Sequence, residues 1–441
     1  MNLGLAEGIE TLRARGVKSD LCERLASFIR EGAPAELLRI APPRLALAWN
    51  VPDADLLDAF LLGTRIGLFE LEWDVRCPSC TGPTAREQHL AKVPSESECP
   101  RCDVHFSSTF DESIEVTWRV HPAIRDLSNV DPNAVFSAYF ASTLVESAVV
   151  EPRGSKIISL ELLKGNYHLA AADRNAQRGL RVTDEGGSGQ IDVAIASASL
   201  DRGPPSRAAG RYDLRVANRS DSPTEFVIAR VTDRPWVSAA RLAAHQSFRD
   251  LFSRELISPD ETFAIRSAAF VFTDLKGSTE LYERIGDARA YPLVRDHFRI
   301  MSECVRRANG AIVKTIGDAI LATFLSAEDA VRFALEMSAA FEEFNTRDRS
   351  REEIVVKVGI HAGPCIVVTQ NETIDYFGRT LNTAARIQGL SRGHDIVLSD
   401  AVARGRGVSA MLSDLPGWSR EDDRVELKGI ASAIDVVRLT R

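Results

Sequence analysis

No apolar run in the sequence reaches the ~20 residues that a helix needs to cross a bilayer. The first residues, MNLGLAEGIETLRARG, place Glu7 and Glu10 where a secretion signal needs basic and then apolar residues. We therefore expect a soluble, cytoplasmic protein with no membrane partner. Basic residues are also outnumbered, 54 against 62 acidic residues, which gives a net charge of −8. This balance excludes a chain-wide basic surface, so nucleic acid is not an expected partner.

Cysteine is scarce, because 7 cysteines in 441 residues are too few for a disulfide scaffold. Hydrophobic residues make up 44% and charged residues 26% of the chain, close to the average of globular proteins, which excludes disorder as the dominant state. At roughly 100–200 residues per domain, the length predicts about three folded parts.

Four of the cysteines form two pairs with a common spacing. Cys77-Pro-Ser-Cys80 is followed, after 18 residues, by Cys99-Pro-Arg-Cys102. Each pair can present two thiolates to one tetrahedral ion, which is typical of a four-cysteine zinc ribbon. Because all four coordination positions would be filled by protein, residues 76–105 predict a structural Zn²⁺ site. Redox sensing is the alternative interpretation of such pairs.

Residues 1–75 predict a helical module that ends in a strand. Pro43 can begin a short helix and Asp53 can cap a second one, while residues 69–75 alternate apolar and charged side chains like a half-buried strand. Helix, turn, helix and strand is the order of a winged helix-turn-helix, which favours DNA binding. However, the second helix carries Asp55, which a phosphate backbone repels, so a small packed module is the simpler interpretation.

The middle of the chain is rich in short β patterns. Between residues 106 and 235, several runs alternate apolar and polar residues, and Gly-, Pro- and Asn-containing turns separate them. We predict an antiparallel β-sandwich without a catalytic set of residues, for which a regulatory, ligand-sensing role and a purely structural role both stay open. Residues 236–262 follow as a predicted helical linker with one apolar face.

Residues 263–441 show the order of an α/β sandwich. A buried strand at 268–275 precedes a long amphipathic helix, and a hairpin turns at Gly317 and Asp318. A second amphipathic helix and a strand at 354–363 follow. The resulting order, β-α-β-β-α-β, is that of the ferredoxin-like fold. The predicted class of the whole chain is therefore multidomain α+β.

Two aspartates stand at neighbouring strand ends of this predicted sheet. Asp274 closes the first strand and Asp318 lies in the hairpin turn, so their carboxylates can meet at one edge. Hard oxygen ligands of this kind suit a pair of Mg²⁺ ions that also bind substrate phosphates. A glycine-containing segment follows Asp274 and begins a helix, where the backbone N–H groups of Gly277, Ser278 and Thr279 can approach phosphate oxygens. This geometry alone fits polymerase palms, diguanylate cyclases and nucleotidyl cyclases equally well.

Four motifs decide between these folds. They are FVFTDLKGST (270–279), VKTIGDAILATF (313–324), VGIHAGP (358–364) and DYFGRTLNTAARI (375–387). In this order and spacing the region resembles the catalytic domain of the class III adenylyl and guanylyl cyclases. The Gly-Gly-Asp/Glu-Glu-Phe turn of diguanylate cyclases is absent from the sequence.

The resemblance implies a role for each matching position. Asp274 and Asp318 correspond to the aspartates that hold two Mg²⁺ or Mn²⁺ ions, and the carbonyl of Leu275 assists at one of them. Lys314 and Asp375 correspond to the pair that reads the base. The remaining roles fall on Asn382, which positions the ribose, on Arg386, which stabilises the transition state, and on Lys428, which binds the terminal phosphates.

The base-reading pair predicts the substrate. Adenine offers an amino donor to Asp375 and an N1 acceptor to Lys314, whereas guanine reverses both contacts. The sequence thus favours an adenylate cyclase that converts ATP to 3′,5′-cyclic AMP and pyrophosphate. Because the family builds each site from two catalytic domains and this chain has one, the resemblance also implies a homodimer. A guanylate cyclase, and a non-catalytic nucleotide-binding or DNA-linked regulator, are the alternatives.

The order of the parts is familiar as well. A helical start, a four-cysteine ribbon, a β region and a cyclase domain resemble a family of bacterial soluble cyclases whose N-terminal domain has no known function. The resemblance implies regulation by the N-terminal region, but it names no ligand.

Overall fold

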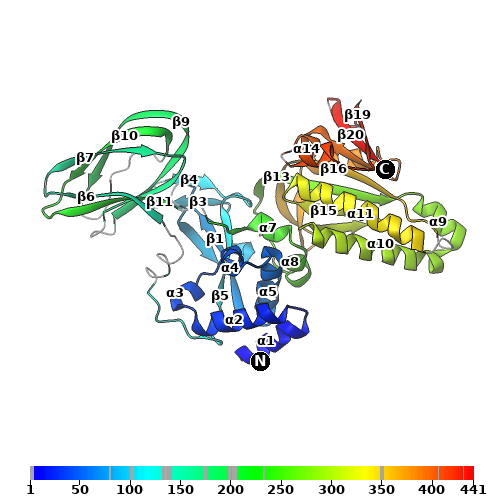
Figure 1. Cartoon of the computed structure of the whole chain (residues 1–441), viewed down its shortest axis with the longest axis horizontal. Coiled ribbons are helices and arrows are strands. Elements are labelled where there is room, and N and C mark those ends of the chain that lie inside the picture. The colour runs from blue at the N-terminus through cyan, green and yellow to red at the C-terminus, as the bar shows by residue number, and fades with distance from the viewer. Residues whose placement is uncertain are drawn as a thin grey trace. The chain divides into compact units, whose positions relative to one another are not determined.

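The computed structural model of the chain describes residues 4–78, 81–99, 104–131, 135, 142–171, 176–196, 200, 206–231, 234–347, 352–405, 407–430 and 432–441. The chain forms two compact units, Met1–Ser238 and Ala239–Arg441, which run from blue to green and from green to red in Figure 1. Among the described residues, no helix has both the length and the apolar character that a membrane crossing requires.

The first unit begins with helices and a four-stranded sheet. The helices are α1 (Leu5–Ala14), α2 (Ser19–Glu31), α3 (Pro34–Leu37), α4 (Pro42–Trp49) and α5 (Asp53–Arg65). The sheet has the order β12-β5-β1-β2, from β12 (Val237–Ser238), β5 (Ile114–Val120), β1 (Phe69–Arg76) and β2 (Pro83–Glu87). A separate hairpin consists of β3 (Glu96–Cys99) and β4 (Val104–Ser107). The strand at 114–120, which the sequence grouped with the central region, thus pairs with β1 instead.

Strand β1 differs from the half-buried strand that its alternation predicts, because both of its faces are covered. Asp74 and Glu115 are completely buried, and both accept from the guanidinium of Arg39 at 3.0 and 3.2 Å. Arg86 adds a second contact to Asp74 at 2.8 Å. Buried carboxylates remain charged only when paired in this way. The sequence could not show the pairing, since Arg39 lies far from both partners along the chain.

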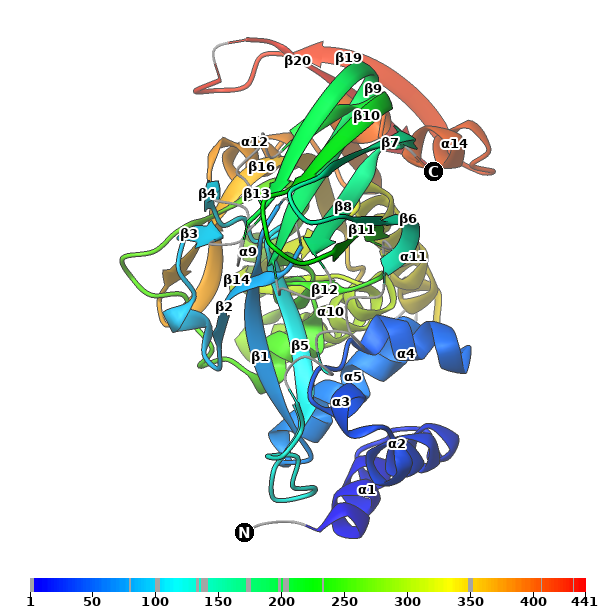
Figure 2. The same cartoon turned by 90° about the vertical axis from the view of Figure 1, so that its left-hand side faces the viewer.

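The central part of the first unit is a six-stranded sheet with the order β6-β11-β8-β9-β10-β7. Its strands are β6 (Ser142–Val150), β7 (Ser155–Leu162), β8 (Gly165–Ala171), β9 (Ala176–Ile195), β10 (Ser206–Asn218) and β11 (Thr224–Val231). The expected sheet-rich centre is present, but a single curved sheet replaces the predicted two-sheet antiparallel sandwich (Figure 2). The reason is the length of β9, which pairs antiparallel with β8 through its first part and parallel with β10 through the rest.

The second unit contains an eight-stranded sheet whose central order is β14-β15-β13-β16. These strands are β13 (Phe263–Leu275), β14 (Ala311–Ile316), β15 (Ala319–Phe324) and β16 (Val356–Gln370). Two long helices, α10 (Asp287–Arg307) and α11 (Ala327–Arg347), connect them. The smaller elements are α9 (Ser278–Ile285), β17 (Thr373–Phe377), α12 (Arg379–Gln388), β18 (Asp395–Ser399), α13 (Asp400–Ala403), α14 (Val408–Ser413), β19 (Ser419–Val425) and β20 (Ile434–Thr440). The chain and sheet orders together are those of the predicted ferredoxin-like core.

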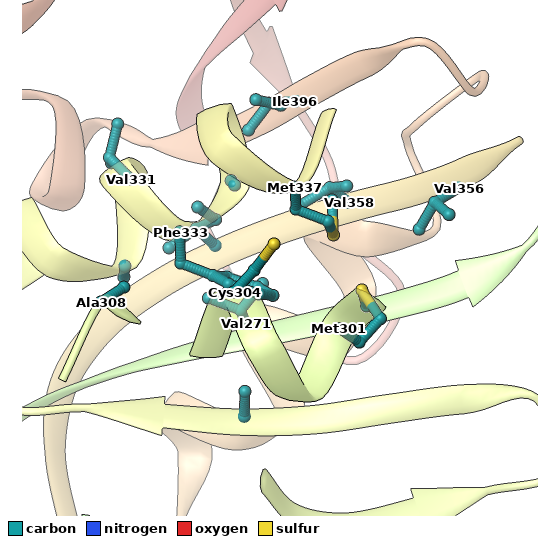
Figure 3. Packing of buried hydrophobic residues seen from close by; sticks show 14 of the residues in the cluster. Val271, Met301, Cys304, Ala308, Val331, Phe333, Met337, Val356, Val358 and Ile396 are labelled. Carbon is teal, nitrogen blue, oxygen red and sulfur yellow. The ribbon is translucent and has the colours of Figure 1, made fainter. Parts of the chain in front are cut away.

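Helices α10 and α11 lie side by side and cover one face of this sheet (Figure 1). Their apolar faces meet Val271 and Val358 of the sheet through Met301, Cys304 and Met337, all of which are buried (Figure 3). This packing fixes the ends of β13 and β15, and therefore the residues at those ends.

The predicted helical linker is wrong as one continuous helix. Residues 237–238 form β12, and two short helices follow, α7 (Ala239–Ala243) and α8 (Gln246–Leu251). The helix is interrupted where Arg249 donates to the carbonyl of Ala243 at 2.7 Å, which replaces a backbone partner. Arg249 also donates to the carbonyl of Ile374 in β17 at 3.0 Å, so α8 anchors that strand.

Candidate active site

The strand register brings Asp274 and Asp318 to the same edge of the sheet. Asp274 is the penultimate residue of β13, and its neighbour Thr273 pairs with Ile320 at the beginning of β15. Asp318 lies in the turn that immediately precedes β15. Burial raises the pKa of the Asp274 carboxyl, and the charge of Asp318 raises it further, so the two carboxylates act on each other. The edge therefore carries two adjacent negative charges.

The two carboxylates fit a divalent cation. The Oδ2 atom of Asp318 is buried, and no group among the described residues donates a hydrogen bond to it. A buried carboxylate oxygen without a donor is costly unless a cation binds it. Two hard oxygen ligands, completed by substrate phosphates, are what Mg²⁺ and Mn²⁺ prefer.

Lys357 is a neighbour of this edge that the motifs did not indicate. It pairs with Asp274 across β13 and β16, and its charge lowers the pKa of the Asp274 carboxyl against the effects of burial and of Asp318. A lysine within the apolar run VVKVGI of a central strand was the available signal. Its ammonium group can balance negative charge on a bound triphosphate as well.

The loop after β13 turns at Gly277, just before α9. Leu275 is buried, and the backbone N–H of Lys276 donates to the carbonyl of Val355 at 2.8 Å, which fixes the loop to the edge of β16. Gly277 has φ +68° and precedes the first residue of α9, Ser278. Ser278 and Thr279 are the first residues of α9, where backbone N–H groups have no partner within the helix and can bind an anion.

The two residues expected to read the base contact each other within one chain. Lys314 follows an irregularity in the pairing of β14, and its Nζ lies 2.5 Å from Oδ2 of Asp375 on β17. The other oxygen of Asp375 accepts from the N–H of Tyr376 at 2.8 Å. The side chain of Asp375 is 5% exposed and that of Lys314 is 41% exposed. The pair is thus oriented by the fold, and its lysine end faces solvent.

Asn382 and Arg386 lie one turn apart on the exposed face of α12. The opposite face packs on β16, where a Cβ atom on Gly359 would lie 2.1 Å from the backbone nitrogen of Gln388. Lys428 is exposed after β19. Within the described ranges, no hydrogen bond or ion pair joins Asn382, Arg386 or Lys428 to the aspartate pair.

His297 is a polar group near the site that the sequence pattern did not single out. It is completely buried on α10 and stacks on Phe341 of α11, with ring centroids 5.4 Å apart. Burial lowers the pKa of His297 to about 4, although the charge and the backbone of Asp318 act in the opposite direction. The imidazole is therefore neutral at physiological pH.

The low pKa of His297 predicts an acid-labile second unit. The unfolded histidine has a pKa near 6.5, so the folded state binds this proton only at lower pH. The contribution of His297 to stability is complete above pH ~6.5 and is lost as the pH falls towards ~4, by up to about 3 kcal/mol. Urea unfolding of the full chain across this range should show the loss, and His297→Phe should reduce it. An unchanged pH dependence in this variant would contradict the assignment.

Comparison with known proteins agrees with the motifs. Residues 263–430 match the family model described as the adenylate and guanylate cyclase catalytic domain, and residues 6–174 match a family of unknown function, DUF5939. An adenylate cyclase of Anabaena cylindrica is 30% identical over 186 residues, which are 39% of this chain and 36% of the relative. Adenylate cyclase 2 of Rhizobium meliloti is 29% identical over 208 residues, which are 44% of this chain and 55% of the relative.

Two solved structures are among the matches of the whole chain. The adenylyl cyclase CyaB from P. aeruginosa is 20% identical, with a TM-score of 0.36 over 41% of this chain and 96% of that one. An adenylate cyclase from Trypanosoma brucei is 22% identical, with a TM-score of 0.34 over 39% of this chain and 89% of that one. The family match shows that residues 263–430 are similar to the catalytic domain of adenylate and guanylate cyclases, in overall sequence as well as in the order of their motifs.

Proposed function

We propose that this chain is an adenylate cyclase, which converts ATP to 3′,5′-cyclic AMP and pyrophosphate. The observation that carries the proposal is the combination of the Asp274–Asp318 edge with the Lys314–Asp375 pair in one domain. The curated relatives named above are adenylate cyclases, although this chain spans only about a third to a half of their length.

The chain's own residues can be assigned to steps of this reaction. Asp274, Asp318 and the carbonyl of Leu275 would hold two Mg²⁺ or Mn²⁺ ions, and Lys357 would balance the remaining charge of the triphosphate. When bound, the ions lower the pKa of the ribose 3′-hydroxyl and neutralise the leaving pyrophosphate. The backbone N–H groups from Gly277 to Thr279, at the start of α9, would bind phosphate oxygens.

The other half of the site would come from a second copy of the chain. Asn382 and Arg386 are exposed on α12, so their side chains are available to a partner. There Asn382 would position the ribose, and the fixed guanidinium of Arg386 would stabilise the extra charge on the α-phosphoryl oxygens. Lys428, which is also exposed, would bind the terminal phosphates. A homodimer would thus contain two equivalent sites.

The Lys314–Asp375 pair favours ATP over GTP, because guanine leaves both groups without a matching partner. An unmatched buried polar group costs roughly 1–3 kcal/mol, or about tenfold in affinity for each contact. The double variant Lys314→Glu, Asp375→Cys should therefore lower the ratio of kcat/KM for ATP to that for GTP by about tenfold or more. The single variant Lys314→Glu is the control, since it places a carboxylate beside buried Asp375 and should fail with both nucleotides. An unchanged ratio in the double variant would contradict the assignment.

The activity itself is tested with purified full-length protein. Incubation with ATP and either Mn²⁺ or Mg²⁺ should produce cyclic AMP and pyrophosphate in equal amounts, measured by chromatography. Addition of EDTA should stop the reaction, and Asp274→Ala serves as the control for contaminating cyclases. If neither metal supports cyclic AMP formation, the proposal fails.

We also propose that the four cysteines of residues 76–105 bind one structural Zn²⁺. Cys77 and Cys99, one from each pair, are buried and pack together with Phe106. The hairpin of β3 and β4 places Cys99 opposite Val104. Cys80 and Cys102 lie outside the described residues, and within the described part no three potential metal ligands gather. Contact between the two pairs is what a shared tetrahedral ion requires.

The zinc site is tested independently of cyclase activity. Elemental analysis of the full chain should give about one zinc per chain, and Cys99→Ser should lower this content and the melting temperature of the first unit. Cys22→Ala is the matched control, because Cys22 is buried in α2 and should leave the zinc content unchanged. Equal zinc contents in Cys99→Ser and in the unmodified chain would overturn the assignment.

A further inference from the structure

Helix α8 binds both of the strands that carry the base-reading pair. Lys314 lies on β14, which is the outermost strand of the order β14-β15-β13-β16. Asp375 lies on β17, which pairs with β16 alone within the described residues. Each strand therefore has one side whose backbone groups the sheet does not use. Whatever binds these open sides influences where the two side chains meet.

Gln246, the first residue of α8, binds the open side of β14. Its Oε1 accepts from the backbone N–H of Ile312 at 2.7 Å. The irregularity of β14 begins at Ile312 and ends at Lys314, so the contact fixes the backbone directly before the lysine. The amide of Gln246 is itself oriented, since its Nε2 donates to Asp250 at 2.8 Å and Arg306 of α10 donates to the same carboxylate at 2.8 Å. Gln246 thus supplies the acceptor that a further strand would supply.

Arg249, three residues further along α8, binds β17. Its Nη1 donates to the carbonyl of Ile374, the residue before Asp375, at 3.0 Å. Its guanidinium carbon lies 5.6 Å from the ring centroid of Tyr376, the residue after Asp375. The Nε atom donates to the carbonyl of Ala243 at 2.7 Å, which holds the arginine to the preceding helix. The backbone is therefore held on both sides of Asp375.

These polar contacts add to the apolar packing of α8. Phe248 is 1% exposed and stacks on Phe252, with ring centroids 5.5 Å apart, so it provides the apolar attachment of the helix. Gln246 and Arg249 each make a contact that ends next to one member of the base-reading pair. One short helix thus links the two strands whose side chains must act together on one base.

We propose that Gln246 and Arg249 are positioning residues, which hold β14 and β17 at the separation at which Lys314 and Asp375 read adenine. This inference rests on the proposed function and deepens it, because it names what sets the choice of base. A donor and an acceptor discriminate between two bases only when the surrounding residues hold both in place. Gln246 and Arg249 themselves do not touch the nucleotide in this arrangement.

The test measures the binding of 3′-deoxy-ATP and of 3′-deoxy-GTP to the full chain with Mn²⁺, by isothermal titration calorimetry. Both nucleotides lack the hydroxyl that would react, so binding is measured without turnover. The unmodified chain should prefer 3′-deoxy-ATP by about 100-fold, roughly tenfold for each of the two contacts. Arg249→Met and Gln246→Met should each lower this preference by about tenfold. A merely structural role would weaken the binding of both nucleotides equally and leave their ratio unchanged.

Three further variants serve as controls. Arg249→Lys keeps one donor for the carbonyl of Ile374, so it should retain more of the preference than Arg249→Met, and it also serves if the methionine variant fails to fold. Arg254→Met removes an exposed arginine of the same segment and should leave the preference unchanged. Val331→Ala opens a space in the core under α11, so it should lower the melting temperature while the preference is kept.

The outcomes separate this inference from the proposed function. If the unmodified chain prefers 3′-deoxy-ATP and both methionine variants keep that preference, the positioning role is refuted and the cyclase proposal stands. The same holds if Val331→Ala lowers the preference as much as Arg249→Met does, because lost stability would then suffice. If the unmodified chain binds the two nucleotides equally, the assignment of Lys314 and Asp375 as the base-reading pair fails, and this inference fails with it.

Discussion

The variant Asp318→Asn should lose about 10³-fold or more of its cyclase activity and yet melt at a higher temperature than the unmodified chain when metal is absent. Activity falls because the metal edge loses one of its two charged ligands. Burial is the larger cause of the raised pKa of Asp274, and the charge of Asp318 is the second. Removing that charge relieves a repulsion in the folded state at neutral pH, so stability rises. The substitution also removes the charge from the buried Oδ2 position of Asp318, where no described residue donates a hydrogen bond.

The two effects are measured on the same samples. Cyclic AMP formation is followed with Mn²⁺, and thermal unfolding is followed in EDTA and again with Mn²⁺, which should raise the melting temperature of the unmodified chain but not that of Asp318→Asn. Asp435→Asn is the control, since Asp435 is an exposed carboxylate on β20 that pairs with Arg424. A destabilised, metal-free Asp318→Asn would contradict the repulsion, and an active one would contradict the role of the aspartate.

The second large effect is expected at Arg386. Replacement by alanine should lower kcat by roughly 10³–10⁵, as loss of a guanidinium that stabilises a phosphoryl transition state does. Lysine should not restore the rate, because an ammonium group lacks the planar, bidentate geometry. The melting temperature should be unchanged, since Arg386 is exposed and has no ion pair among the residues described.

Steady-state kinetics with ATP and Mn²⁺ test this expectation, with circular dichroism as the check on folding. Arg404→Ala is a suitable control, because Arg404 is also exposed and its ion pair is with Asp400 of the neighbouring helix α13. If Arg386→Ala keeps a kcat within about tenfold of the unmodified chain, Arg386 is not the group that stabilises the transition state.

The aspartate edge could be predicted from the sequence, whereas His297 and Lys357 could not. Strand ends and a two-residue hairpin fix where Asp274 and Asp318 meet, so local patterns suffice there. The apolar pattern of α10 predicts a buried face of Val294, Phe298, Met301, Val305 and Ala308. The structure buries the last three, but it leaves the first two half-buried and buries Leu293, His297 and Ile300 as well. A polar residue on a buried face carries no periodic signal, and only the tertiary fold shows which group it faces.

The N-terminal unit was harder to predict for a related reason. Pairing between distant segments decides its architecture, as β5 joins β1 from beyond the β3–β4 hairpin and β12 joins β5 across more than a hundred residues. Alternating charges along β1 indicate a solvent-exposed face only where no buried cation pairs with them. Here the buried guanidinium of Arg39 pairs with Asp74. The prediction of one continuous helical linker was wrong because β12 and the side chain of Arg249 bind backbone groups that such a helix would use in its own hydrogen bonds.

The central claim is that one chain supplies the metal edge and its partner supplies Arg386 to the same site. Mixing Asp318→Asn with Arg386→Ala, each inactive alone, tests it directly. Random exchange of subunits should make half of the dimers mixed, each with one intact site, and so restore about a quarter of the unmodified activity. If mixed dimers form, as shown by differently tagged chains that co-purify, and no activity returns, then the site is not divided between two chains.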